Sequence, residues 1–122
     1  MSSTPPGSPD PEHVLPDAAR EAIAGVLDPG ESVESVAPAV GSSLVLTQRR
    51  IMVVRDGASF RPKSGVRPFD LGPGLSIRIG PGRRRVIVES GSSTINLFVR
   101  SEQLAAAEAF VAEVRRRIYH EA

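Results

Sequence analysis

The sequence predicts an α+β domain that is mainly β: about seven antiparallel strands in a partly open barrel, closed by a C-terminal amphipathic helix and preceded by a short N-terminal helix. Three observations support this prediction. Short runs of aliphatic residues, separated by Gly and Pro, recur about every ten residues between 31 and 100. Apolar residues at helical spacing lie before and after these runs. The length of 122 residues suits a single domain.

The chain begins with a segment that we expect to be a disordered, Pro-rich tail. Residues 1–13 contain four prolines and almost no apolar side chains, so burial cannot offset the entropy lost on ordering. The single domain is therefore expected to span residues 14–122. Its first element is a helix of about eleven residues that starts at Asp17 and ends at Asp28-Pro29-Gly30. The apolar face of this helix consists of Ala19, Ala22, Ile23, Val26 and Leu27.

Seven runs are typical of strands. They cover residues 31–40, 43–48, 50–55, 65–71, 75–79, 83–89 and 93–100. Pro38 indicates an edge or a bend in the first run, and Pro68 weakens the fourth, because proline lacks the N–H that a central strand needs. The Gln48-Arg49 turn between the second and third runs lacks the glycine of a tight hairpin, so we expect a connection longer than these two residues.

The last element is the strongest. One apolar stripe at helical spacing is formed by Leu104, Ala107, Phe110, Val111, Val114 and Ile118. Ser101 is the expected N-cap of this helix. Residues 115–117 are three arginines in the last turns, where cations complement the helix dipole, and Glu113 and Arg117 have the spacing of an i,i+4 pair.

The composition excludes several classes of site. No cysteine is present, which excludes disulfide scaffolds, thiol catalysis and zinc ribbons. His13 and His120 lie near the two ends, so we expect neither a multi-histidine metal site nor a buried general base. Residues 72–74 and 80–82 are Gly-Pro-Gly turns between strand runs and not phosphate loops. We therefore expect no enzyme, no cofactor and no small-molecule substrate.

Charge is unevenly distributed along the chain. Residues 1–30 have a net charge of −4, residues 31–100 of +6 and residues 101–122 of −1. A basic body between acidic flanks can attract an acidic partner, anionic lipid or phosphates. The densest cluster, Arg83-Arg84-Arg85, alternates between the two faces of its strand and has no aromatic neighbour for base stacking, so nucleic acid is not an expected partner.

The hydropathy pattern predicts a cytoplasmic location. No apolar run exceeds about five residues, so we expect no segment that spans a membrane. The first residues carry no apolar stretch of the kind that forms a secretory leader.

Two stretches and the order of the elements resemble the bacterial pleckstrin-homology-like (PH-like) domains. Leu27–Glu31 is similar to the helix end that runs through a "PGE" turn into the first strand, and Leu44–Ile51 is similar to the "LTxRR" strand–turn–strand of that family. A last strand followed by an amphipathic helix extends the likeness over residues 15–120. The resemblance implies two near-orthogonal antiparallel sheets of four and three strands, closed at one end by the helix, and a scaffold more than a lipid reader.

Two hypotheses about function are compatible with these features. The first is a non-enzymatic interaction module that binds a protein partner or self-associates through an exposed strand edge near Val33, Val36 and Val40. The second is peripheral binding to anionic lipid at the inner face of the membrane through the loop of residues 56–64. The residues that would carry this binding are Phe60, Arg61 and Lys63, assisted by Arg49 and Arg50. A structural alternative for Arg49 or Arg50 is an ion pair with an acid on a neighbouring strand.

Overall fold

The computed structural model describes residue 15 and residues 17–56 and 65–120. Along the chain the elements are α1 (Asp17–Ala24), β1 (Val33–Ala39), β2 (Ser42–Thr47), β3 (Arg50–Arg55), β4 (Val66–Asp70), β5 (Leu75–Ile79), β6 (Arg85–Ser90), β7 (Ser93–Phe98) and α3 (Leu104–His120). Short 3₁₀ turns, η3 (Pro81–Arg83) and η4 (Ser101–Gln103), precede β6 and α3. Each predicted strand is present within two residues of its expected bounds. The predicted tail lies outside the described residues.

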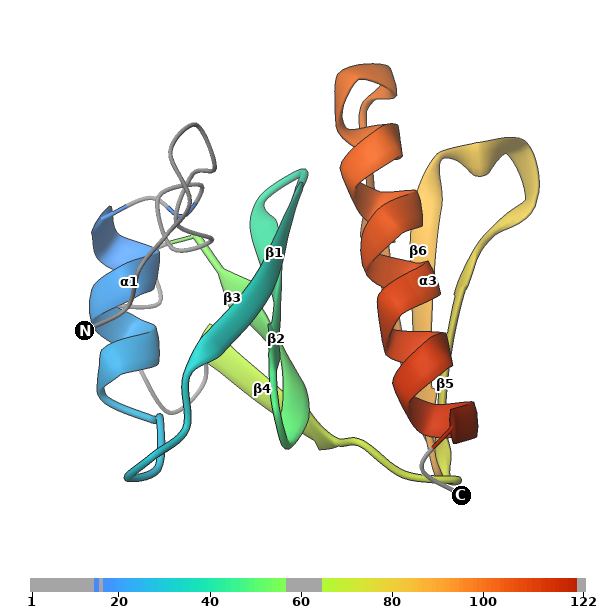
Figure 1. Ribbon diagram of the computed structural model, residues 1–122. Coiled ribbons are helices and arrows are strands. Elements are labelled where there is room, and N and C mark those ends of the chain that lie inside the picture. The colour runs from blue at the N-terminus through green and yellow to red at the C-terminus, as the bar shows by residue number, and fades with distance from the viewer. Residues whose placement is uncertain (1–14, 16, 57–64, 121–122) are drawn as a thin grey trace, which may run out of the picture.

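The strands form two antiparallel sheets that do not close into a barrel (Figure 1). The larger sheet has the order β1-β2-β3-β4 and the smaller one the order β5-β6-β7, so each strand pairs with its neighbours in sequence. The mainly β class, the two sheets and the two helices are thus confirmed.

Alternation along the strands creates two apolar clusters on opposite faces of the larger sheet. The face toward the smaller sheet and α3 contributes Leu44, Leu46, Ile51, Val53 and Phe69 to the main core. The opposite face contributes Val45, Met52, Val54 and Val66 to a second cluster, which is covered by Leu15, Ala19, Ala22 and Ile23 of the α1 region. β2 is buried along its whole length, because apolar neighbours lie on both of its faces. The short helix α1 is held by this packing and not by its own propensity.

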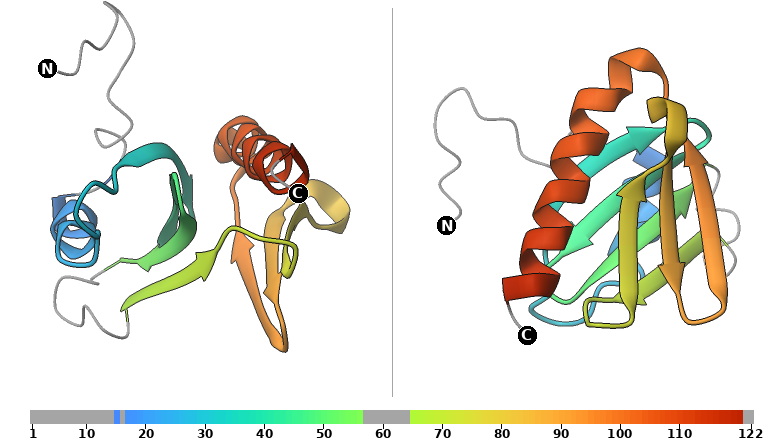
Figure 2. Two further views of the ribbon diagram at one scale, coloured as in Figure 1. Left: turned by 60° about the horizontal axis from the view of Figure 1, so that its bottom comes forward. Right: turned by 90° about the vertical axis from the view of Figure 1, so that its right-hand side faces the viewer.

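α3 lies along one side of the sandwich, where it contacts β1 and β5 (Figure 2). The predicted stripe is confirmed: Ala107, Phe110, Val111 and Val114 are buried in the main core, and Leu104 and Ile118 pack against it. On the opposite side, between β4 and β7, the described part of the chain places no helix. No described helix is long and apolar enough to cross a membrane.

The start of α3 differs from the prediction. Ser101 begins the η4 turn, and no side chain caps that turn in the expected way. Instead, the Arg100 N–H donates to Gln103 Oε1 at 2.9 Å, and the Gln103 N–H donates to the Arg100 carbonyl at 2.9 Å. The prediction of a Ser101 cap is therefore wrong, because the longer amide side chain of Gln103 takes that role. The predicted Glu113–Arg117 pair is present at 3.2 Å.

Candidate functional site

Arg49 and Arg50 lie at the turn between β2 and β3 and hold the segment that connects α1 to β1. Arg50 Nε and Nη2 donate to the two carboxylate oxygens of Glu31 at 2.9 and 2.8 Å, and Nη2 also donates to the Val26 carbonyl at 2.7 Å. The side chain of Arg50 is only 17% exposed, and that of Glu31 is fully buried. Arg49 is exposed and pairs with Asp28 at 3.2 Å. Both arginines thus pair with acids, which precede β1 and do not lie on a strand.

The buried Glu31 carboxylate is satisfied by several donors. Besides Arg50, Thr47 Oγ1 donates at 2.7 Å and the Asp28 N–H at 2.9 Å. The pKa of Glu31 is lowered to about 2, chiefly by the hydrogen bonds from Arg50; burial opposes this shift, and the Asp28 amide and the Thr47 hydroxyl add to it. This cluster joins α1, β1 and the β2–β3 hairpin, and it has the character of a structural clamp.

Thr47 also explains why the β2–β3 connection is shorter than expected. Its hydroxyl oxygen accepts the N–H groups of Arg49 and Arg50, each at 3.2 Å, which closes the turn over two residues without a glycine. The amide of Gln48 accepts from the Ser32 N–H at 2.9 Å and donates to the Gly30 carbonyl at 2.7 Å. The expectation of a longer connection was wrong, because side-chain hydrogen bonds replace the glycine conformation.

The edge residues predicted for partner contact fall on a strand that is partly occupied. β1 is an edge strand of the larger sheet. Val33 and Val36 are half-buried and pack against the cluster under α1. Glu34 forms an ion pair with Arg117 of α3. Val40 is 45% exposed, and its N–H donates to the Phe98 carbonyl at 2.8 Å.

The loop predicted to touch a membrane lies outside the described residues except for Asp56. Phe60, Arg61 and Lys63 lie outside the described residues. Their proposed role stays a prediction from the sequence.

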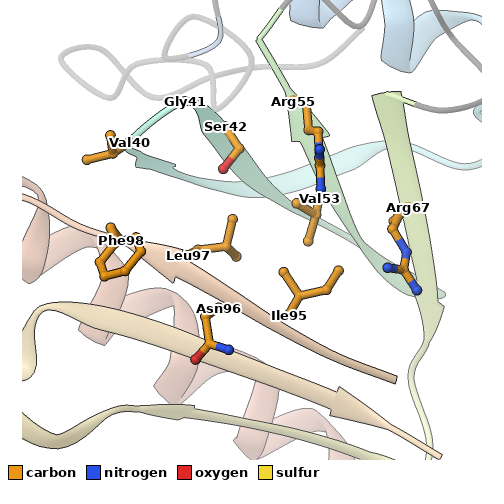
Figure 3. Close-up of a pocket in the computed structure, with 10 residues that line it drawn as sticks. All are labelled: Val40, Gly41, Ser42, Val53, Arg55, Arg67, Ile95, Asn96, Leu97 and Phe98. Carbon is orange, nitrogen blue, oxygen red and sulfur yellow. The ribbon is translucent and has the colours of Figure 1, made fainter. Parts of the chain in front are cut away.

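A groove of about 220 Å³ opens between the two sheets on the side away from α3 (Figure 3). This volume is below the ~300–1,000 Å³ typical of small-molecule pockets. The groove is therefore smaller than the pockets that usually enclose a drug-sized ligand. The lining comes from the β1–β2 turn, the start of β2, β3, β4 and β7: Val40, Gly41, Ser42, Val53, Arg55, Arg67, Ile95, Asn96, Leu97 and Phe98.

Arg55 and Arg67 are on the inward face of the larger sheet. Arg55 follows Ile51 and Val53 at alternate positions of β3, and Arg67 precedes Phe69 in the same way on β4. Figure 3 shows both side chains on the side of their strands that faces β7. The guanidinium of Arg67 lies over the Phe69 ring, 5.6 Å from its centre, which helps to orient it.

No carboxylate among the described residues forms an ion pair with Arg55 or Arg67. Two guanidinium groups without such an ion pair can donate hydrogen bonds to a carboxylate or a phosphate. Sequence reasoning missed both residues. The sequence nevertheless contains a signal. By alternation both arginines occupy core-facing positions of their strands, Arg55 two residues after Val53 and Arg67 two residues before Phe69.

A second hollow, at the start of α3, is less suited to an anion. It is lined by Arg83, Arg84 and Arg100, but also by Glu102, and Arg83 is already paired with Glu108 of α3. The groove between the sheets is therefore the stronger candidate. Among the described residues, no three His, Cys, Asp or Glu side chains are grouped so that they could hold a metal ion.

Comparison of the chain with protein-family models, curated proteins and solved structures finds no match.

Proposed function

We propose that this chain is a non-enzymatic, PH-like interaction module that binds a protein partner through the groove between β4 and β7. The observation that carries the proposal is the pair of inward-facing arginines, Arg55 and Arg67, in a groove bordered by exposed apolar side chains. Both arginine side chains are exposed, so their guanidinium groups are accessible to a carboxylate of a partner.

The border of the groove has the composition of a protein interface. Phe98 is 61% exposed and Val40 is 45% exposed, and they are two of the three large apolar side chains that stand out on the described surface. Aromatic residues and arginine are enriched in protein interfaces and contribute most of their hot spots.

The order of the elements supports the PH-like assignment. Four strands, three strands and a C-terminal helix follow one another as the resemblance implies, and the helix covers one side of the sandwich. The opposite side carries the groove. A rigid sandwich with one uncovered side is a suitable frame for a binding surface.

Site-specific photocrosslinking in the cells that naturally make the protein tests this proposal. Benzoylphenylalanine replaces Asn96, an exposed residue at the border of the groove, or Ala112 on the exposed face of α3 as the control position. We expect a discrete protein adduct from position 96, none from position 112, and loss of the adduct when Arg55→Gln and Arg67→Gln are introduced.

Three outcomes would contradict the proposal. They are adducts from position 112 only, no protein adduct at all, and recovery of lipid in place of protein at position 96. The last would favour the anionic membrane as the partner.

A further inference from the structure

The four edges of the two sheets are not equally open. The N–H of Val40, which directly follows β1, points outward to the Phe98 carbonyl. By alternation, Pro38 of β1 also faces outward and offers no donor, and α3 contacts the same strand. On β4 the Leu71 N–H donates inward to the Arg49 carbonyl, which places Pro68 on the outward register. β5 is contacted by α3. Only β7, within the described sheets, has neither a proline nor a helix at its edge.

The outward groups of β7 follow from its register with β6. The Val99 N–H donates to the Arg84 carbonyl at 2.8 Å, so Leu97 and Ile95 also exchange hydrogen bonds with β6. Phe98, Asn96 and Thr94 then direct their main-chain groups away from β6. The Phe98 carbonyl is used by Val40, whereas no described backbone group bonds Asn96 or Thr94 on that side. These two residues present donors and acceptors for a further strand.

A strand added beside β7 would meet the two arginines. Added strands lie about 4.8 Å from their neighbour, and their inward side chains continue the face of Ile95 and Leu97, which points toward Val53, Arg55 and Arg67 in Figure 3. Arg67 is paired with Val53, and Arg55 is two positions further along β3. Arg55 and Arg67 are therefore diagonal neighbours on adjacent strands, and such neighbours lie about 7–8 Å apart. This separation is close to the ~6.7 Å between alternate residues of a single strand. Two alternate side chains of one segment can therefore reach both guanidinium groups.

The positive charges of Arg55 and Arg67 determine which kind of segment can bind beside β7. In a second copy of this chain, the equivalent strand Ser93–Phe98 has the sequence STINLF, which offers no carboxylate to the arginines. A phosphate group would supply charge but no main-chain partner for Thr94 and Asn96. An extended segment with acidic side chains at alternate positions satisfies both requirements.

We propose that β7 accepts an extended segment of a partner protein as an additional strand, and that Asp or Glu residues two positions apart in this segment bind Arg55 and Arg67. The inference rests on the proposed function and specifies the chemistry and the pairing of the partner. Main-chain hydrogen bonds to Thr94 and Asn96 supply affinity, and the two ion pairs select acidic sequences and fix the register.

Panning of a phage library of random twelve-residue peptides against the whole chain tests the acidic specificity. We expect enrichment of sequences with Asp or Glu at positions i and i+2 among β-forming residues. The most enriched peptide is then labelled with fluorescein, and its Kd is measured by polarisation. The Arg55→Gln/Arg67→Gln variant should bind about tenfold more weakly or worse. The control variant Arg84→Gln/Arg115→Gln has the same net charge and should bind like the wild type.

A scan of the peptide by N-methylation tests strand pairing without altering the protein. Methylation of every second backbone amide should abolish binding, whereas methylation of the intervening amides should have little effect, because only one register of a strand faces its neighbour. A uniform effect, or none, overturns strand addition.

The remaining outcomes separate this inference from the proposed function. Absence of enriched peptides, enrichment without alternate acids, or equal losses in the groove and control variants overturns the inference. If the crosslink from position 96 to a protein nevertheless persists, the interaction module stands and its mode of recognition is a different one.

Discussion

The Glu31 carboxylate shows how one residue joins three elements. It is buried, yet it accepts hydrogen bonds from Arg50, Thr47 and the Asp28 amide. Because all of these donors come from the β2–β3 hairpin and from the segment that follows α1, the ion pair fixes the position of α1 relative to the larger sheet. From the sequence, Arg50 is a candidate for binding anionic lipid or for a structural ion pair. Its contacts favour the structural role.

Removal of Arg50 should be much more destabilising than removal of its neighbour. Arg50→Ala leaves the Glu31 carboxylate buried without its main partner, which costs about 3–5 kcal/mol of unfolding free energy. Arg49→Ala breaks an exposed pair with Asp28 and should cost at most about 1 kcal/mol. Urea denaturation followed by circular dichroism gives both values. Similar losses in the two variants would show that the clamp contributes nothing special.

The Glu31 carboxylate should also make the free energy of unfolding depend on pH. The pKa of Glu31 is lowered from 4.5 to about 2 in the folded protein, so folding favours the ionised form. This contribution, on the order of 3 kcal/mol, is complete above about pH 5 and is lost as the pH falls through 4.5 toward 2. In urea titrations between pH 6 and 2.5, the Glu31→Gln variant should lose less stability than the wild type. Parallel curves for the two proteins would contradict the assignment.

Among the elements, α3 is held in position by the one apolar stripe that it packs into the main core. Phe110 is buried among both sheets' core residues, whereas Tyr119, at the end of the same helix, is 69% exposed. Phe110→Ala should therefore cost about 3–5 kcal/mol, and Tyr119→Ala less than about 0.5 kcal/mol. Thermal unfolding of the two variants measures the difference. A comparable effect of both would mean that α3 does not seal the core through this stripe.

The elements could be predicted from the sequence because their patterns are local. Alternation in Leu75, Ile77 and Ile79, and the helical spacing after residue 103, each identify an element and its buried face without knowledge of the fold. The short turn at Gln48-Arg49 could not be predicted in this way. Its closure depends on the Thr47 hydroxyl, which substitutes for the usual glycine.

The candidate site was less predictable, since it depends on which strands become neighbours. Arg55 and Arg67 are twelve positions apart in the sequence and come together only through the pairing of β3 with β4. The choice among the four edges likewise requires the position of α3 and the outward registers of Pro38 and Pro68. From sequence alone, β1 was the expected contact edge. In the structure β1 is flanked by α3, and the contact edge that we propose is β7.

For the whole molecule, the two sides of the sandwich differ in what covers them. One side is sealed by α3 against β1 and β5, and the other presents the groove with two arginines and the open edge of β7. Most of the basic charge lies in residues 31–100, which carry a net charge of +6. In the proposed function, this charge would steer an acidic partner toward the molecule, and the groove would determine where the partner binds.

Hydrogen–deuterium exchange on the complex with the crosslinked partner tests most directly whether the partner binds beside β7. The chain is compared with and without the partner, and backbone protection is mapped over the four edge strands. We predict new protection confined to residues 93–98, strongest at Thr94 and Asn96, with β1 and β5 unchanged. New protection in residues 33–39 or 75–79, without any in residues 93–98, would contradict the account and place the partner on a different edge.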